Sequence, residues 1–208
     1  MNALPDPSPP VSGLVPEVRR KLLEAAARLL SEEGPSALSA RRLAREASTS
    51  TMAVYTQFGG MPALVREVVA EGFARLRERL ATVEHTDDAL ADLVQLCRAY
   101  RENALEHPNL YTVMFGGTSL GGYRLSRADM DVGTDTFTAL ADALDRVMGA
   151  GLIRRENSRH VAGQCWSALH GYIMLEIAGI YRAEDGTTEL VLDPLLSRLL
   201  AVPITMGP

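Results

Sequence analysis

Apolar residues recur every three or four positions along most of the chain, which is the spacing of one face of an α-helix. No segment shows the alternation of apolar and polar residues that a half-buried strand requires. Helices are predicted over residues 17–33, 62–80, 87–106, 108–115, 128–149, 157–181 and 193–201. Together with two short helices between the first two of these, the pattern predicts an all-α fold of about nine helices.

Two short helices separated by a tight turn are predicted after the first long helix. Ser39 should cap a helix that runs to about Ala47, and Ser50 should cap another that runs to about Phe58. A serine side chain at this position accepts hydrogen bonds from the free N–H groups of the first helical turn. Many all-α proteins contain such helix pairs only as packing units, so the pair alone does not predict DNA binding.

The net charge of −5 is informative only when it is divided along the chain. Residues 17–80 carry 11 Arg and Lys against 8 Asp and Glu, whereas residues 81–208 carry 10 against 17. A cationic N-terminal part joined to an acidic C-terminal part fits a DNA-binding unit attached to a second domain. An ordinary solvated surface would give the same distribution. The chain of 208 residues is long enough for two such units.

Several features argue against other classes of protein. Residues 1–16 contain five prolines and are expected to form a disordered arm rather than a signal sequence. The longest apolar stretch, residues 171–181, is too short to span a bilayer and contains Glu176, so we expect a cytoplasmic protein without a membrane partner. Cys97 and Cys165 fit no disulfide or zinc spacing, and neither a metal site nor another cofactor is predicted.

A longer pattern surrounds the two short helices. It runs from Lys21-Leu22-Leu23-Glu24-Ala25-Ala26 through Leu43-Ala44-Arg45-Glu46-Ala47 and Val54-Tyr55-Thr56-Gln57-Phe58 to Leu64. This pattern resembles the N-terminal DNA-binding domain of the TetR (tetracycline-repressor-like) family. The resemblance implies a three-helix helix-turn-helix domain with its connecting helix over residues 17–80, with the motif at 39–58. A helical ligand-binding and dimerisation domain would occupy residues 81–208.

The same resemblance implies a regulator of transcription. Members of the family bind double-stranded DNA as homodimers, and a small effector, here expected to be mostly apolar, usually releases the DNA. We therefore expect a repressor that acts on a pseudo-palindromic operator. The segments at 157–181 and 193–201 would form an intersubunit four-helix bundle through Val161, Leu169, Ile173, Ile177, Leu195, Leu196 and Leu199.

The expected DNA contacts lie on the two short helices. Val54 and Phe58, four residues apart, should point into the domain core and leave the first turn and the outer face of their helix free for the major groove. The Tyr55 hydroxyl could reach a phosphate, and the starts of both helices could hold phosphates through backbone N–H groups and guanidinium groups. The candidate DNA-binding residues are Ser39, Arg41, Arg42, Thr49, Ser50, Thr51, Met52, Ala53, Tyr55, Thr56 and Gln57.

Two positions depart from the family pattern. Ser48 stands in the turn where the family usually has glycine, and a left-handed backbone at serine costs about 1 kcal/mol. Met61 stands where the family often has a lysine that binds a phosphate. We therefore expect a slightly strained or differently shaped turn and one phosphate contact fewer.

The C-terminal half carries a second pattern, Trp166-Ser167-Ala168-Leu169-His170-Gly171, preceded by His107-Pro108-Asn109-Leu110-Tyr111. It resembles a subgroup of TetR regulators with a Trp-x-x-x-His-Gly signature. Trp166 and His170 share a helix face, where they could line a cavity, pack a dimer interface or simply belong to the core. The candidate ligand-binding residues are Cys97, Tyr100, Tyr111, Met114, Phe115, Phe137, Trp166, His170 and Met174.

An enzyme is the alternative from another functional class. Gly117-Thr118-Ser119-Leu120-Gly121 satisfies the G-x-S-x-G pattern of the α/β-hydrolase nucleophile elbow, with Ser119 as the nucleophile. That elbow requires a parallel sheet, which the sequence does not predict, so we expect no catalytic residue. A helical interaction module without a DNA role is a third possibility, which a salt-dependent gel shift would distinguish.

Overall fold

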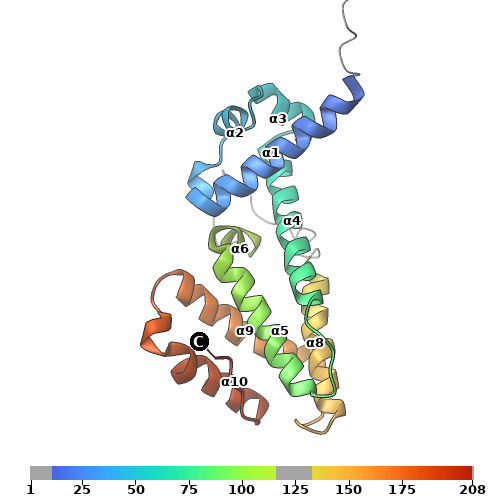
Figure 1. The fold of residues 1–208 in the computed structure, drawn as a ribbon, viewed down its shortest axis with the longest axis vertical. Coiled ribbons are helices and arrows are strands. Elements are labelled where there is room, and N and C mark those ends of the chain that lie inside the picture. The colour runs from blue at the N-terminus through green and yellow to red at the C-terminus, as the bar shows by residue number, and fades with distance from the viewer. Residues whose placement is uncertain (1–10, 116–132, 208) are drawn as a thin grey trace, which may run out of the picture.

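The computed structural model describes residues 11–115 and 133–207, which contain nine α-helices and no strand (Figure 1). The α-helices are α1 Val11–Glu33, α2 Ala40–Glu46, α3 Thr51–Phe58, α4 Met61–Ala81, α5 Ala89–Glu106, α6 Pro108–Met114, α8 Thr134–Gly149, α9 Ser158–Ile177 and α10 Asp193–Leu200. Shorter helical turns are η1 Pro35–Ala37, η2 Ala183–Asp185 and η3 Thr188–Leu192. The all-α prediction is therefore confirmed for the part of the chain that the structure describes.

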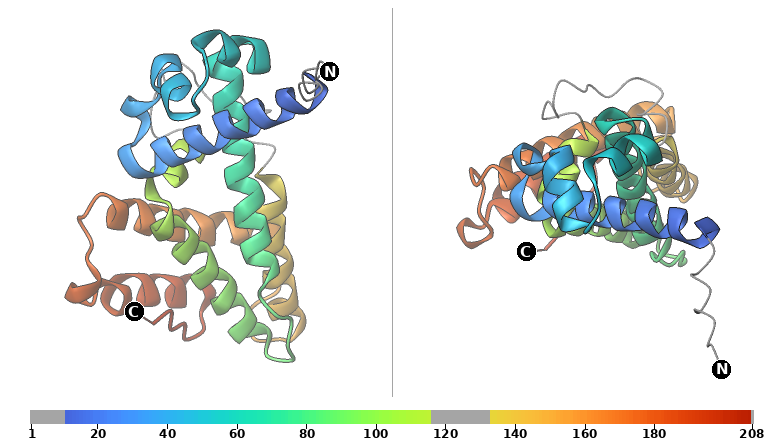
Figure 2. Two further views of the ribbon diagram at one scale, coloured as in Figure 1. Left: turned by 45° about the horizontal axis from the view of Figure 1, so that its top comes forward. Right: turned by 90° about the horizontal axis from the view of Figure 1, so that it is seen from above.

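Helix α4 connects two groups of helices (Figures 1 and 2). Helices α1 and α3 pack against α4 at one end of the molecule, and α2 packs against α1 and α3. The C-terminal half of α4 runs beside α5 and α8, and α9 and α10 complete the other end. The short helix α6 lies between the two groups, where it packs against α1, α4 and α5. The fold therefore places a small N-terminal unit on a larger C-terminal one.

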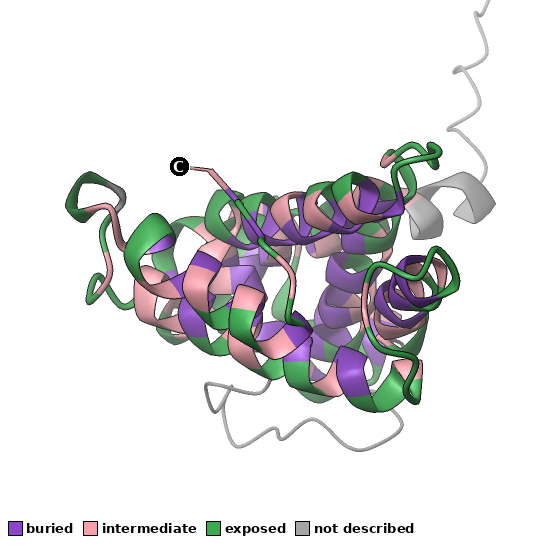
Figure 3. Cartoon of the chain, turned by 90° about the horizontal axis from the view of Figure 1, so that it is seen from below, coloured by how far each residue is buried: buried purple, intermediate pink, exposed green. Residues whose placement is uncertain are grey.

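Both groups are built around apolar side chains at helical spacing. In the N-terminal group, Leu22, Leu43, Val54 and Leu64 come one from each of the first four α-helices, and all are fully buried. The C-terminal helices also bury their inward faces, as a view from their end of the molecule shows (Figure 3). Each such side chain contributes about 1.5–3 kcal/mol through its removal from water.

The first helix begins earlier than the sequence predicted. α1 starts at Val11, directly after two prolines, rather than at residue 17. The prediction of a disordered arm is therefore wrong for residues 11–16. Pro16 was interpreted as the helix start because proline fits best in a first turn. It lies inside α1 instead, at the expense of one backbone hydrogen bond.

Helix α9 ends at Ile177 rather than at about residue 181. Gly179 adopts a left-handed φ of 71°. The N–H groups of Gly179 and Ile180 donate to the carbonyls of Glu176 and Leu175, each at 2.9 Å. These two bonds form the Schellman motif that commonly ends a helix at glycine. The apolar pattern continues beyond this glycine, which is why the sequence predicted a longer helix.

The last helix also starts differently. Asp193 was predicted to cap α10, but it is the first residue of the helix, and the π-helical turn Thr188–Leu192 leads directly into it. The Asp193 carboxylate instead accepts a hydrogen bond from the backbone N–H of Met206 at 2.9 Å. The predicted helix over 128–149 is confirmed from Thr134 to Gly149, and residues 128–132 lie outside the described ranges.

A buried ion pair ties α5, α9 and the π-helical turn together. The Arg101 guanidinium binds both carboxylate oxygens of Glu176, at 2.9 and 2.7 Å, and also donates to the Thr188 hydroxyl at 3.3 Å. The two charged side chains are only 10% and 6% exposed. Removing one partner would leave the other charge buried and uncompensated. The resulting loss of folding free energy is far larger than the net stabilisation that the intact pair provides.

We predict that Glu176→Ala lowers the free energy of unfolding by about 3–5 kcal/mol. The matched control is Glu156→Ala, because the Arg154–Glu156 pair has a similar length of 2.7 Å but side chains that are 82% and 47% exposed. That control should cost less than about 1 kcal/mol. Urea unfolding followed by circular dichroism measures both values, and equal losses would contradict the structural role assigned to Glu176.

Candidate DNA-binding surface and ligand cavity

The two short helices begin as their serines predict. The backbone N–H of Arg42 donates to Ser39 Oγ at 3.3 Å, and that of Ala53 donates to Ser50 Oγ at 3.2 Å. Both caps are confirmed. The turn between the helices places Ser48 at a left-handed φ of 51°. The glycine-like backbone expected at Ser48 is therefore present, at a cost of about 1 kcal/mol.

Helix α3 has one buried face and one exposed face. Val54 is 0% and Phe58 8% exposed, so both belong to the core as predicted. On the opposite side Met52 is 67% and Tyr55 54% exposed. The fold gathers all eleven candidate DNA-binding residues at one end of the molecule, on α2 with its N-cap Ser39, on α3 and in the turn between the two helices (Figure 1). Arg42, Thr49, Ala53 and Gln57 are only partly exposed.

The two candidate arginines of α2 differ in their surroundings. Arg42 forms ion pairs with Glu33 at 2.6 Å and with Glu46 at 3.3 Å. Arg41 is exposed, and it forms no ion pair or side-chain hydrogen bond with any residue in the described ranges. Of the two guanidinium groups, only that of Arg41 is free to bind a phosphate without first leaving a carboxylate.

Sequence reasoning missed the residue that holds the far end of α3. The guanidinium of Arg19, on α1, lies 4.4 Å from the centre of the Phe58 ring. It also forms an ion pair with Glu67 of α4 and donates to the backbone carbonyl of Gln57. A cation over an aromatic face and beside the last carbonyls of a helix stabilises both. The sequence offered no signal for Arg19, because its position on α1 could equally face solvent.

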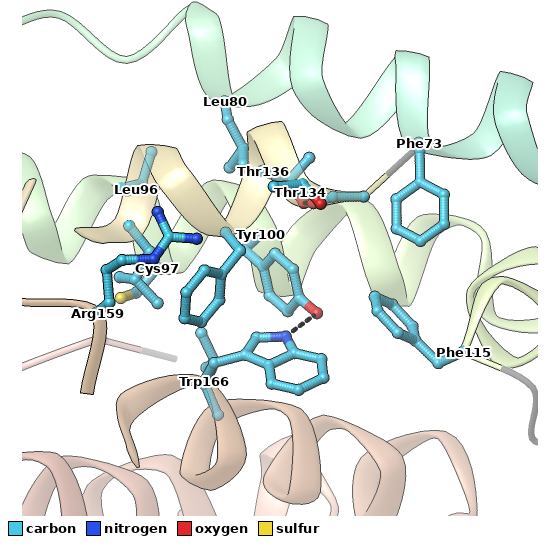
Figure 4. A pocket seen from close by; sticks show the side chains of 14 residues that line it. Phe73, Leu80, Leu96, Cys97, Tyr100, Phe115, Thr134, Thr136, Arg159 and Trp166 are labelled. Atoms are coloured by element: carbon cyan, nitrogen blue, oxygen red, sulfur yellow. Dashed lines mark hydrogen bonds between the residues drawn. The ribbon is translucent and has the colours of Figure 1, made fainter. Parts of the chain in front are cut away.

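An apolar cavity of about 230 Å³ lies within the C-terminal group of helices (Figure 4). Five of the nine candidate ligand-binding residues line it, namely Cys97, Tyr100, Phe115, Phe137 and Trp166. The lining residues that sequence reasoning missed are Phe73, Leu80, Leu96, Gly133, Thr134, Thr136, Leu140, Arg159 and Leu169. Phe73 and Leu80 are the important omissions, because they come from α4, which was assigned to the N-terminal domain. Their spacing of seven residues places them on one helix face.

The other four candidate ligand-binding residues do not line this cavity. Tyr111 and Met114 are each 1% exposed, whereas His170 and Met174 are partly buried. Met114 packs against α4 at Gly72, where an added Cβ would lie 2.7 Å from its sulfur. Only glycine fits at this crossing of α4 and α6 unless Met114 moves.

Tyr111 and His170 instead extend a hydrogen-bonded chain behind the cavity. The Trp166 indole N–H donates to the Tyr100 hydroxyl at 2.9 Å, which lies 2.9 Å from the Tyr111 hydroxyl. The Tyr111 hydroxyl lies 2.6 Å from His170 Nδ1. Burial lowers the pKa of His170 and raises that of Tyr100 to about 12. With a neutral imidazole, every hydroxyl finds an acceptor if Tyr100 donates to Tyr111 and Tyr111 donates to Nδ1.

The Trp166 and His170 rings stack on each other at 5.1 Å between centroids. The shared helix face that the sequence predicted for this pair is therefore confirmed. Trp166 lines the cavity and donates to Tyr100 (Figure 4). His170 lies within hydrogen-bond distance of Tyr111 at the other end of the same chain, so α9 contributes both of its ends.

The expected dimer interface on α9 and α10 is wrong for some of its residues. Four of the seven apolar residues named for that interface are buried in the subunit's own core, namely Val161, Leu169, Ile173 and Leu196. Leu195 is 41% exposed, and Leu190 of the π-helical turn is 73% exposed. Helical periodicity predicted that the four residues would be buried, but it could not show whether the same subunit or a second subunit covers them.

Other kinds of site receive no support from the described residues. Burial raises the pKa of the Cys97 and Cys165 thiols to about 12, which makes them poor nucleophiles. No group of side chains able to hold a metal ion occurs within 11–115 and 133–207. No helix in the same ranges is long and apolar enough to cross a bilayer. Ser119, the nucleophile of the hydrolase alternative, lies outside the described residues.

Comparison with known proteins agrees with this arrangement. An uncharacterised HTH-type transcriptional regulator of Mycobacterium tuberculosis is 28% identical over 186 residues, which cover 88% of this chain and 80% of that protein. A Rhodococcus sp. RHA1 protein of unknown function aligns with a TM-score of 0.73 and 26% identity, over 89% of this chain and 95% of that one. The TetR family regulator PfmR of Thermus thermophilus aligns with a TM-score of 0.64 and 20% identity, over 88% of this chain and 98% of that one.

Two family models match the two groups of helices. Residues 22–68 match the bacterial regulatory proteins of the tetR family, and residues 93–199 match the tetracyclin repressor-like C-terminal domain. The second match alone spans half of the chain. The protein therefore belongs to the TetR family of DNA-binding transcriptional regulators.

Proposed function

We propose that the protein is a ligand-released repressor that binds a pseudo-palindromic operator as a homodimer. Residues 17–80 would form the DNA-binding domain and residues 81–208 the ligand-binding and dimerisation domain. The observation that carries this proposal is the path of α4. Leu64 is fully buried near the start of α4, which packs against α1 and α3, and Phe73 and Leu80 line the cavity. A ligand in the cavity therefore touches the helix that supports the DNA-binding unit.

In this proposal α3 enters the major groove with its exposed face. Thr51 and Gln57 would contact base edges, and the exposed Met52 side chain would meet a thymine methyl group. Arg41 and the Tyr55 hydroxyl would bind phosphates, since neither group has a partner among the described side chains. Arg42 would contribute mainly by holding α2 against Glu33 of α1.

Substitutions on this surface should separate by role. Arg41→Gln and Tyr55→Phe should weaken binding to all duplexes about equally. Because a homodimer carries two copies of Arg41, Arg41→Gln should reduce the slope of log K against log salt by about two. Thr51→Ala and Gln57→Ala should relax preference at single base pairs by about 1–3 kcal/mol. Fluorescence anisotropy on an operator selected from random DNA, and on point variants of it, measures both effects.

Arg155→Gln is the control for the loss of one positive charge. Arg155 is exposed and lies in the connection between α8 and α9, at the opposite end of the molecule from α2 and α3 (Figure 1). This substitution should leave affinity unchanged. If all four substitutions on α2 and α3 behave like the control, α3 is not the recognition helix.

A second copy of the chain would pack on the outer face of α9. Gly163, Ser167 and Gly171 follow one another at every fourth position, which places them on one face of the helix. An added Cβ at either glycine would meet no atom within 4 Å, so this face is open in the subunit. Small residues allow a partner helix to approach closely, and the exposed Leu195 of α10 would extend the contact.

We predict that Gly171→Arg weakens dimerisation at least about tenfold, because it inserts a long charged side chain at the two-fold contact. The subunit should still fold, since the site is open and glycine is unfavourable within a helix. Gly149→Arg is the matched control at an equally open position on α8. Sedimentation equilibrium measures the change, and a wild-type monomer at micromolar concentration would refute the dimer.

We also infer that the chain belongs to the subgroup with the Trp-x-x-x-His-Gly signature. Each residue of the signature has a distinct place that supports this inference. Trp166 lines the cavity, His170 accepts from Tyr111, and Gly171 lies on the open face of α9.

A further inference from the structure

Among the described residues that line the cavity, one carries a charged side chain. Of the lining residues that the structure describes, only Arg159 is ionised at neutral pH. Its guanidinium lies 5.5 Å from the centre of the Phe137 ring, and it forms no ion pair with the carboxylates of the described chain. By contrast, Arg146 on neighbouring α8 is paired with Asp92 at 2.8 Å. The cation at the cavity is therefore not neutralised by the subunit's described residues.

Other polar groups of the lining already have partners. The Trp166 indole N–H is bound to Tyr100, and the Tyr100 hydroxyl is bound to Tyr111. The Thr136 hydroxyl donates to the Gly133 carbonyl at 2.6 Å. A ligand in this cavity therefore meets the free donors of Arg159 and, apart from the Thr134 hydroxyl, mostly apolar surface.

The cation lies at one end of the cavity. In Figure 4, Arg159 is drawn beside Cys97, and Phe73 and Phe115 lie on the opposite side of the view. Those two rings meet edge to face at 5.6 Å between centroids. An apolar cavity of about 150 Å³ can hold benzene, so a cavity of about 230 Å³ can hold a somewhat larger apolar body.

We propose that the effector of this regulator is an apolar carboxylic acid. Its body, somewhat larger than a benzene ring, lies between Trp166 and the Phe73–Phe115 pair, and its carboxylate binds the Arg159 guanidinium. This assignment rests on the proposal that the cavity binds the effector. A planar guanidinium offers two parallel N–H donors that match a carboxylate. Arg159 also lies in the first turn of α9, where the helix dipole favours an anion.

The overall charge of the protein does not explain such a preference. The chain carries a net charge of −5, so long-range electrostatics disfavours anions. Selective binding of an acid over its neutral analogue would therefore require a local cation, and among the described lining residues that cation is Arg159.

The test compares two probes of nearly equal shape, phenylpropionate and its neutral analogue phenylpropanol. Binding to the full-length protein is followed by calorimetry and by the emission of Trp166, the chain's single tryptophan. Each probe is titrated into the wild type, Arg159→Gln and Arg155→Gln. Arg155 is the matched control, because it is exposed, unpaired in the described structure and four residues away, and it does not line the cavity.

The wild type should bind phenylpropionate about tenfold or more tightly than phenylpropanol, as expected for a charge-assisted hydrogen bond. Arg159→Gln should remove this preference and leave the affinity for phenylpropanol within about twofold of the wild type. That second result excludes a general loss of structure. Arg155→Gln should retain the full preference.

Two other outcomes would overturn the proposal of an acidic effector. The first leaves the cavity as a ligand site, and the second refutes that role as well. If the wild type binds both probes equally, or if Arg159→Gln keeps the preference, the cavity binds ligands but Arg159 does not select an acid. If neither probe produces heat or changes Trp166 emission at millimolar concentration, the acid assignment fails together with the proposed role of the cavity.

Discussion

Helix α4 has to pack against both groups of helices at once, and the rest of the structure depends on that constraint. Leu64 and Val68 are buried in the half of α4 that packs against α1 and α3, and Phe73 and Leu80 line the cavity in the C-terminal group. Close packing leaves little room for independent movement at either end. At Gly72 the helix approaches α6 so closely that no Cβ fits without displacing Met114. Packing through α4 therefore joins the DNA-binding unit directly to the wall of the cavity.

A second connection passes through α6. The Asn109 side chain donates to the Ser31 carbonyl at the end of α1, at 2.5 Å. Two residues later, Tyr111 joins the hydrogen-bonded chain between Tyr100 and His170. A buried chain in which each hydroxyl donates to the next group is rigid, because any break leaves an unpaired polar group. The wall of the cavity is thus joined to the DNA-binding unit in two ways, by the apolar packing of α4 and by the hydrogen bonds of α6.

The sequence predicted local features better than contacts between distant helices. The caps at Ser39 and Ser50 and the turn at Ser48 depend on a few consecutive residues, and all were predicted. Part of the cavity lining was also predicted, because bulky side chains on the C-terminal helices had to face inward. Phe73 was missed because periodicity shows which face of α4 is buried, but not that the C-terminal half of α4 packs against the C-terminal group of helices. Arg159 was missed because a charged residue at a helix start is usually solvated.

Hydrogen exchange with and without operator DNA tests the coupling through α4 most directly, because it needs no effector. Exchange reports local opening along the chain, and coupled elements open together. If α4 and α6 transmit the state of the DNA-binding unit, DNA should slow exchange in peptides covering residues 73–81 and 108–114, beyond the surface that α2 and α3 present. Slower exchange confined to residues 19–68 would contradict the account, because the cavity would then be independent of DNA binding.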